Sequence, residues 1–87
     1  MASYRIAIKR SAAKELERIG TRKDREAIAS PIRALAADPR PAGCERLAGR
    51  SSVYRIRQGD CRILYSIEDE GLVVLVIRIG HRRDVYR

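Results

Sequence analysis

The chain has 87 residues, of which 45% are hydrophobic and only four, all tyrosines, are aromatic. A chain of this length buries too little apolar surface to be divided, so we expect one domain over residues 1–87, and no apolar run approaches the roughly 20 residues of a membrane span. Its 19 Lys and Arg against 11 Asp and Glu leave a net charge of +8, which favours nucleic acid or an acidic protein as partner over a merely solvated surface.

The first predicted element is an edge strand at residues 3–9. Apolar residues alternate there with polar and cationic ones, as is typical of a strand with one buried face. A helix should follow over residues 12–19, with Ser11 as its N-cap and Gly20 positioned to end it.

A second helix should begin almost at once, because Thr21 and Asp24 resemble a capping box. Apolar residues then recur at helical spacing through Ala36, which provides one face for the core. Pro31 complicates this helix, since proline removes one backbone donor and crowds the carbonyl four residues before it. Two outcomes stay open: the helix kinks at Pro31, or Ser30 caps a new segment.

The middle of the chain leads into a β-hairpin. Residues 38–43 are rich in proline and are predicted to form a loop within the domain, while residues 44–52 show no clear pattern. Residues 53–65 contain two alternating runs on either side of a turn at residues 58–60, which indicates a hairpin. Gly59 supplies the backbone freedom that a short hairpin turn requires.

This hairpin is predicted to carry a cationic surface. Strand side chains alternate with a period of two, so Tyr54 and Ile56 point to one face while Arg55 and Arg57 point to the other. Arg62, just past the turn, adds a further guanidinium. Tyr54 and Tyr65 are both expected on the apolar, core-facing side of the hairpin.

An acidic turn at residues 68–71 should separate the hairpin from a last strand at residues 72–80, which carries Arg78 near its end. The consecutive aliphatic residues at 72–77 predict a central strand buried on both faces. The order of elements predicts an α+β fold: one small domain with a mostly antiparallel four-stranded sheet and an N-terminal two-helix hairpin packed on one face.

Familiar catalytic patterns do not assemble in this sequence. There is no Ser-His-Asp set, no paired-carboxylate site and no glycine-rich phosphate loop. Cys44, Cys61 and His81 lack the spacing of metal ligands, so we expect neither a metal nor a cofactor. The N-terminus has no apolar secretion signal, and we expect a cytoplasmic protein without a membrane partner.

Three runs of the sequence resemble the RelE branch of the RelE/ParE toxin superfamily: YRIR at 54–57, GDCRILY at 59–65 and LVVLVIRIGHRRDVY at 72–86. The order of elements fits along the whole chain. The resemblance implies the toxin of a type II toxin-antitoxin system, an mRNA interferase that cuts messenger RNA on the ribosome and so inhibits translation. It also implies a cognate acidic antitoxin, held with the toxin in a hetero-oligomer.

By the same resemblance, the catalytic candidates are Arg55, Arg57, Arg62, Arg82 and Tyr86. The chain departs from the family pattern at Arg55 and Arg57, where lysines are frequent, and the segment between Gly80 and Tyr86 is shorter than in the best-known members. Arginine keeps its proton at neutral pH, so Arg55 and Arg57 are suited to hold phosphate and unsuited to act as a general base. Proton transfer is left to Tyr86 or to His81, for which a surface position at a strand end is the simpler explanation.

The candidates for RNA binding are Arg55, Arg57, Arg78, His81, Arg83 and Arg87. Fixed guanidiniums would stabilise the charge that builds when a ribose 2′-hydroxyl attacks the adjacent phosphate, which yields a 2′,3′-cyclic phosphate without a metal. Tyr86 is suited either to stack on a base or to pack. Two alternatives to the interferase stay open: a ParE-like inhibitor of DNA gyrase, and a non-catalytic nucleic-acid-binding module for which net charge would suffice.

Overall fold

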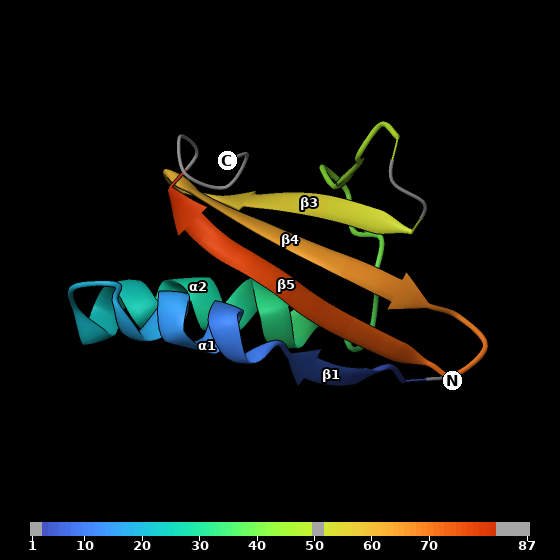
Figure 1. Ribbon diagram of the computed structural model, residues 1–87, viewed down its shortest axis with the longest axis horizontal. Coiled ribbons are helices and arrows are strands. Elements are labelled where there is room, and N and C mark those ends of the chain that lie inside the picture. Colours follow the sequence, from blue (N-terminus) through green and yellow to red (C-terminus); the bar gives the residue numbers. More distant parts are fainter. Residues whose placement is uncertain (1–2, 50–51, 82–87) are drawn as a thin grey trace.

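The computed structural model describes residues 3–49 and 52–81. Its elements are β1 (Arg5–Ile8), α1 (Arg10–Glu17), α2 (Arg22–Ala34), β2 (Glu45–Arg46), β3 (Val53–Gln58), β4 (Cys61–Glu68) and β5 (Val73–His81). The strands form one sheet in the order β1-β5-β4-β3-β2, and the two helices lie side by side in a layer packed against it (Figure 1). The predicted α+β class and the helical layer on one face are confirmed.

The sheet differs in two ways from the predicted four-stranded, mostly antiparallel one. It has five strands, and β1 runs parallel to β5, with Arg5 opposite Val73 and Ile8 opposite Val76. The edge position predicted for β1 is confirmed. The parallel pairing could not be read from the sequence, because alternation shows which face of a strand is buried and not which neighbour it pairs with.

The fifth strand is β2, which lies in the stretch that showed no pattern. Glu45 pairs with Arg55 and Arg46 pairs with Tyr54, so this short strand extends the hairpin at the edge of the sheet. Two polar residues carry no periodicity, which is why the strand was missed. It has a direct consequence for the site, because it places a carboxylate beside Arg55.

Helix α1 begins two residues before the predicted start, and Ser11 is not its N-cap. The N-cap is Lys9, without a side-chain hydrogen bond. The Lys9 N–H donates to the carbonyl of Val76 at 2.9 Å, while its own carbonyl accepts from the Ala13 N–H at 2.9 Å. Lys9 is thus bonded to the sheet and to the helix at once, and the chain enters α1 directly from β1.

Helix α2 begins as predicted and runs through its proline. The Asp24 N–H donates to Thr21 Oγ1 at 3.0 Å, which confirms Thr21 as the N-cap. The helix is continuous past Pro31 to Ala34, so Ser30 does not start a separate segment. Pro31 lies close to the end of the helix, where the loss of one backbone bond interrupts little that follows. In the described part of the chain, no helix is long and apolar enough to cross a membrane.

The aliphatic run of β5 had predicted a strand buried on both faces, and this prediction is wrong. Val74, Val76 and Ile79 are buried, whereas Leu75 and Ile77 are only half-buried, because the helices cover one face of the sheet. The buried residues are two positions apart from Val74 to Val76 and three apart from Val76 to Ile79. A register shift lies at this point, since Val76 pairs with β4 and Ile77 is the extra residue of a bulge. The bulge returns Ile79 to the core.

Two tyrosines hold the core to the loop at residues 38–43. Tyr65 is fully buried, and its hydroxyl donates to the Pro39 carbonyl at 2.8 Å. Burial raises the pKa of this hydroxyl, so it stays a protonated donor. Tyr54 stacks on Tyr65 with 6.0 Å between ring centroids, and it packs against the core from its strand. The predicted core positions of both rings are confirmed.

Candidate functional site

The predicted cationic surface lies on the side of β3 and β4 that faces away from the helices. Arg57 is directly opposite Arg62 in the antiparallel register, and Arg55 is opposite Leu64. Directly opposed residues share a face of the sheet. Tyr54 and Ile56 of the same strand pack into the core, which leaves the arginines on the other side. We call Arg55, Arg57 and Arg62 the arginine face.

The arginine face depends on a two-residue turn between β3 and β4. Gln58 pairs with Cys61, so only Gly59 and Asp60 lie between the paired ends. Gly59 has a φ of 58°, in the left-handed region that residues with a Cβ rarely adopt. The prediction that this glycine permits the turn is confirmed, and the turn fixes the register that brings Arg57 against Arg62.

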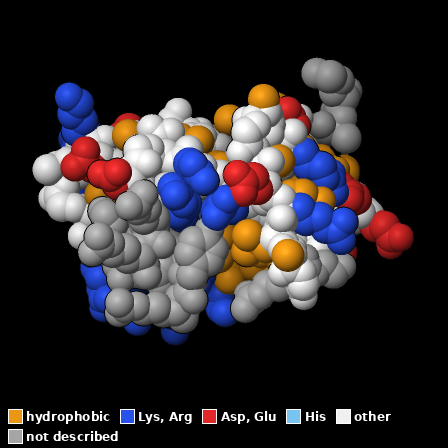
Figure 2. Space-filling model, turned by 90° about the horizontal axis from the view of Figure 1, so that it is seen from above, with side chains coloured by type: hydrophobic (Ala, Val, Ile, Leu, Met, Phe, Trp, Pro, Cys, Tyr) orange, Lys and Arg blue, Asp and Glu red, His pale blue; other side chains and the backbone are white. Residues whose placement is uncertain are grey.

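A carboxylate that sequence reasoning missed lies on this face. Glu45 of β2 accepts a hydrogen bond from Arg55 Nη2, and its other oxygen lies 3.9 Å from Arg57 Nη2. The Arg55 side chain is only 14% exposed, whereas those of Arg57 and Glu45 are 58% and 56% exposed. Figure 2 shows basic atoms directly beside acidic ones over the described part of this side of the molecule. The signal that was available is an acidic residue in an unassigned stretch just before a basic strand.

Arg62 is half-buried on this face. Its Nε is buried and has no hydrogen-bond partner among the described residues. Leu64, two residues further along the same face, is 4% exposed although it does not belong to the core cluster.

Arg78 lies opposite Leu64 in the register, and its charge is partly offset. Arg78 Nη2 is 3.5 Å from Glu15 Oε2 of α1, and the other oxygen of Glu15 accepts from the Ile79 N–H at 3.1 Å. Glu15 therefore supplies an acceptor along the part of β5 that extends beyond its pairing with β1. The predicted role of Arg78 in RNA binding stays a prediction.

The other predicted site residues lie at the end of the chain. Arg82, Arg83, Tyr86 and Arg87 are outside the described residues, and of His81 only the backbone is described. The register places His81 opposite Cys61 and Gly80 opposite Arg62. Strand β5 thus ends beside the arginine face, at the end of the sheet that carries the hairpin turn.

A second polar cluster lies at the other end of β4. Arg40 donates from both terminal nitrogens to the Asp69 carboxylate, at 3.1 and 2.9 Å, and its Nε donates to the Tyr54 hydroxyl at 3.2 Å. The Tyr4 hydroxyl donates to the same carboxylate at 2.7 Å. Hydrogen bonds from Arg40 and Tyr4 lower the pKa of Asp69, and the bond to Asp69 raises the pKa of Tyr4. This cluster joins the proline-rich loop to the turn before β5, which makes it a structural element and not part of the arginine face.

Comparison with known proteins gives consistent matches over nearly the whole chain. A family model described as the ParE toxin of the type II toxin-antitoxin system parDE matches residues 6–86. The curated Toxin RelG of Mycobacterium tuberculosis is 26% identical to this chain over 84 residues, which cover 97% of each protein.

Solved structures agree with the sequence matches. The isolated RelE toxin of E. coli superimposes with a TM-score of 0.77 at 28% identity, over 98% of this chain and 92% of that chain. A chain of the RelBE2 toxin-antitoxin complex of Mycobacterium tuberculosis superimposes with a TM-score of 0.81 at 24% identity, over 97% of both chains, a likeness that concerns the fold. The superimposed lengths include the elements that build the arginine face.

Proposed function

The chain belongs to the ParE toxin family of type II toxin-antitoxin systems, in the RelE branch of the RelE/ParE superfamily, and we propose that it is a ribosome-dependent mRNA interferase. The observation that carries this proposal is the clustering of Arg55, Arg57 and Arg62 on one side of a hairpin, away from the helical layer. In this proposal the three guanidiniums bind the phosphate at which the messenger RNA is cut.

Electrostatics favour phosphate as the group bound there. Guanidiniums bind phosphate through paired, charge-assisted hydrogen bonds, and the net charge of +8 raises the local concentration of a polyanion. Attack of a ribose 2′-hydroxyl on the adjacent phosphate builds negative charge on the phosphorane oxygens. Arginines whose backbone positions are set by β-sheet pairing stabilise this charge. The bond from phosphorus to the 5′-oxygen then breaks, which leaves a 2′,3′-cyclic phosphate on one fragment and a 5′-hydroxyl on the other.

The reaction also needs a general base, which Arg55 and Arg57 are unsuited to supply. We propose Glu45 for this role. A guanidinium stays protonated at neutral pH, whereas a carboxylate accepts a proton. Glu45 already contacts both arginines. In our proposal the scissile phosphate binds the two guanidiniums and displaces Glu45 from them. The displaced carboxylate then removes the proton of the 2′-hydroxyl.

The end of the chain completes this proposal. Gly80 lies opposite Arg62 and β5 ends at the next residue, His81, so the last described residue lies beside the arginine face. We assign Arg82 to stabilisation of the transition state and Tyr86 to stacking on a base or to proton transfer. His81, Arg83 and Arg87 bind RNA together with Arg78.

The cognate antitoxin is the expected protein partner, since relatives of this chain are solved as toxin-antitoxin complexes. We propose that its acidic surface neutralises the arginine face. Attraction between opposite charges speeds association and is screened by salt, so the association rate should fall as ionic strength rises. A rate that is independent of salt would refute this electrostatic part of the proposal.

A ParE-like action on DNA gyrase is the second candidate, and it is favoured by the family description that matches the chain. The two candidates separate in one pair of assays. Cleavage of messenger RNA on programmed ribosomes, lost in Arg57→Ala and Arg62→Ala, supports the interferase. Inhibition of gyrase supercoiling by the parent and by both variants, with intact messenger RNA, supports the alternative. Binding to RNA without either activity would leave only a nucleic-acid-binding module.

A further inference from the structure

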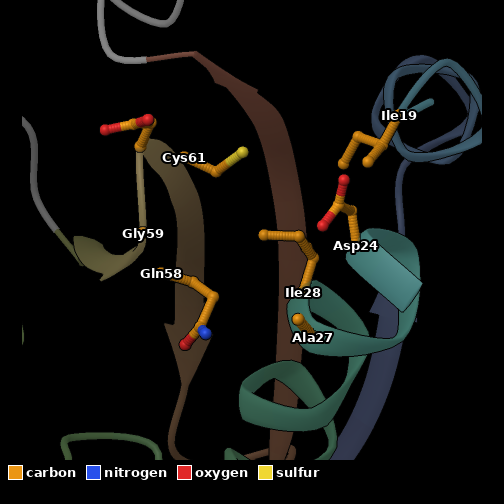
Figure 3. A pocket seen from close by; sticks show the side chains of 8 residues that line it. Ile19, Asp24, Ala27, Ile28, Gln58, Gly59 and Cys61 are labelled. Atoms are coloured by element: carbon orange, nitrogen blue, oxygen red, sulfur yellow. The ribbon is translucent and has the colours of Figure 1, made fainter. Parts of the chain in front are cut away.

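A pocket of about 380 Å³ lies between the helices and the turn of the β-hairpin. Ile19 follows α1, Asp24, Ala27 and Ile28 belong to α2, and residues 58–61 form the opposite wall. Figure 3 shows the side chains of Ile28 and Cys61 facing this space from opposite walls, with the Asp24 carboxylate beside Ile19. Its volume falls within the range of roughly 300–1,000 Å³ that is usual for ligand pockets.

The pocket lies across the sheet from the arginine face, and its lining includes two acidic side chains. Cys61 packs against the core, while the next residue, Arg62, belongs to the other face. Among the described residues, the lining contains the carboxylates of Asp24 and Asp60 but no Lys or Arg. Arg25 lies beside the lining, where its guanidinium donates to the Ile19 carbonyl at 2.8 Å.

Neither carboxylate has an ion pair among the described residues, which is also true of Glu17, Asp38, Glu68 and Glu70. Glu15, Glu26, Glu45 and Asp69 each bind an arginine. Asp24 and Asp60 both lie close enough to influence Cys61: burial is the main cause that raises the pKa of this thiol, and the charges of Asp60 and Asp24 add to it. The same charges repel phosphate, which argues against nucleic acid as the occupant.

We propose that this pocket is a docking site for one lysine or arginine side chain of a partner protein. The aliphatic stem of such a side chain matches the walls formed by Ile19, Ala27 and Ile28, and its charged end matches the carboxylates. The proposal is independent of RNA cleavage, since it uses none of the residues of the arginine face. It gives the protein a second contact surface on the side of the sheet that carries the helices.

The first test titrates the full-length protein with butylguanidinium and follows the methyl signals of Ile19 and Ile28 by NMR. Butylguanidinium carries the charge and stem of an arginine, pentanoate has the opposite charge, and butanol has none. We expect saturable shifts of both methyl groups with butylguanidinium alone. Equal shifts with pentanoate or butanol, or no shift with butylguanidinium, would overturn the proposal.

The second test removes the two charges. Asp24→Asn with Asp60→Asn should weaken butylguanidinium binding by roughly twofold to thirtyfold, the range expected for two exposed ion pairs. Glu68→Gln with Glu70→Gln makes the same change of net charge at two exposed positions, the last residue of β4 and the turn after it, and should leave the affinity unchanged. Equal weakening in both double variants would show that only the net charge acts.

A third test fills the pocket without changing its charge, because Asp24→Asn could also weaken the start of α2. Ala27 is exposed on α2 and belongs to the lining, so Ala27→Leu should abolish the shift of the Ile28 methyl. Ala34→Leu, at an exposed position of the same helix outside the lining, is the matched control. Binding of butylguanidinium to Ala27→Leu with the parent affinity would contradict the assigned position.

Discussion

Glu45→Gln separates the two roles that the structure suggests for this carboxylate. In the free protein Glu45 competes with phosphate for Arg55 and Arg57, and in the proposed reaction it removes a proton. Glutamine keeps the size and the hydrogen-bonding capacity of the side chain while it removes the charge and the basicity. The substitution should therefore strengthen RNA binding and slow cleavage.

The magnitudes follow from the exposure of the three side chains. Glu45 and Arg57 are more than half exposed, so their ion pair is worth about 0.2–1 kcal/mol, whereas the pair with Arg55, whose side chain is only 14% exposed, is screened less by solvent. Loss of both competing pairs should tighten RNA binding by about twofold or more. Loss of a general base should slow cleavage by about a hundredfold to ten-thousandfold.

Two measurements on programmed ribosomes check this expectation. Binding is measured with a messenger RNA that carries a 2′-deoxy nucleotide at the cleavage site, and cleavage is measured in a single turnover at saturating toxin. Glu70→Gln, the same change in an exposed turn, is the control. Cleavage by Glu45→Gln at the parent rate would refute the role as base. Slower cleavage with weaker binding would mean that Glu45 only holds the arginines in place.

Three further substitutions test the fold that positions the site. Tyr65→Phe leaves the buried Pro39 carbonyl without its donor and should lower the free energy of unfolding, measured by urea titration, by about 1–3 kcal/mol. An unchanged urea midpoint would show that this hydrogen bond does not stabilise the fold. Gly59→Ala should cost about 1–2 kcal/mol, because a Cβ has space there but the positive φ disfavours it, and Gly59→Asn should cost less; equal stability of all three proteins would contradict this reasoning. Arg40 lowers the pKa of Asp69, so this bond stabilises the fold above the unfolded pKa of about 3.9 and is lost as the pH falls through the lower folded value. As the pH falls from 5 through the lowered pKa of Asp69, the free energy of unfolding should therefore decrease more for the parent than for Asp69→Asn. Equal decreases in both proteins would show that the pair of Arg40 and Asp69 contributes nothing to stability.

Local patterns in the sequence were sufficient to predict the hairpin and the arginine face. The alternation along β3 and the glycine in the turn involve neighbouring residues, and they place Arg55, Arg57 and Arg62 on one side of the sheet. The same holds for the start of α2, where Thr21 accepts from the N–H of a residue one turn later. Each of these features is determined by contacts within a few residues.

Contacts between distant segments could not be predicted in this way. Arg40 and Asp69 are 29 residues apart, and Tyr4 and Asp69 are 65 apart, so no periodicity relates them. Glu45 meets Arg55 through a two-residue strand, which is too short to show a pattern. The bulge at Ile77 lies in a run of aliphatic residues, where alternation is invisible and burial on both faces was the natural expectation.

The most direct test of the account is the chemistry of the RNA ends after incubation of the protein with ribosomes that carry a defined messenger RNA. Attack by the 2′-hydroxyl at a phosphate held by Arg55, Arg57 and Arg62 predicts a 2′,3′-cyclic phosphate on the upstream fragment and a 5′-hydroxyl on the downstream one, both identified by mass spectrometry. Fragments with a 3′-hydroxyl and a 5′-phosphate, or a messenger RNA that stays intact on the ribosome, would contradict it.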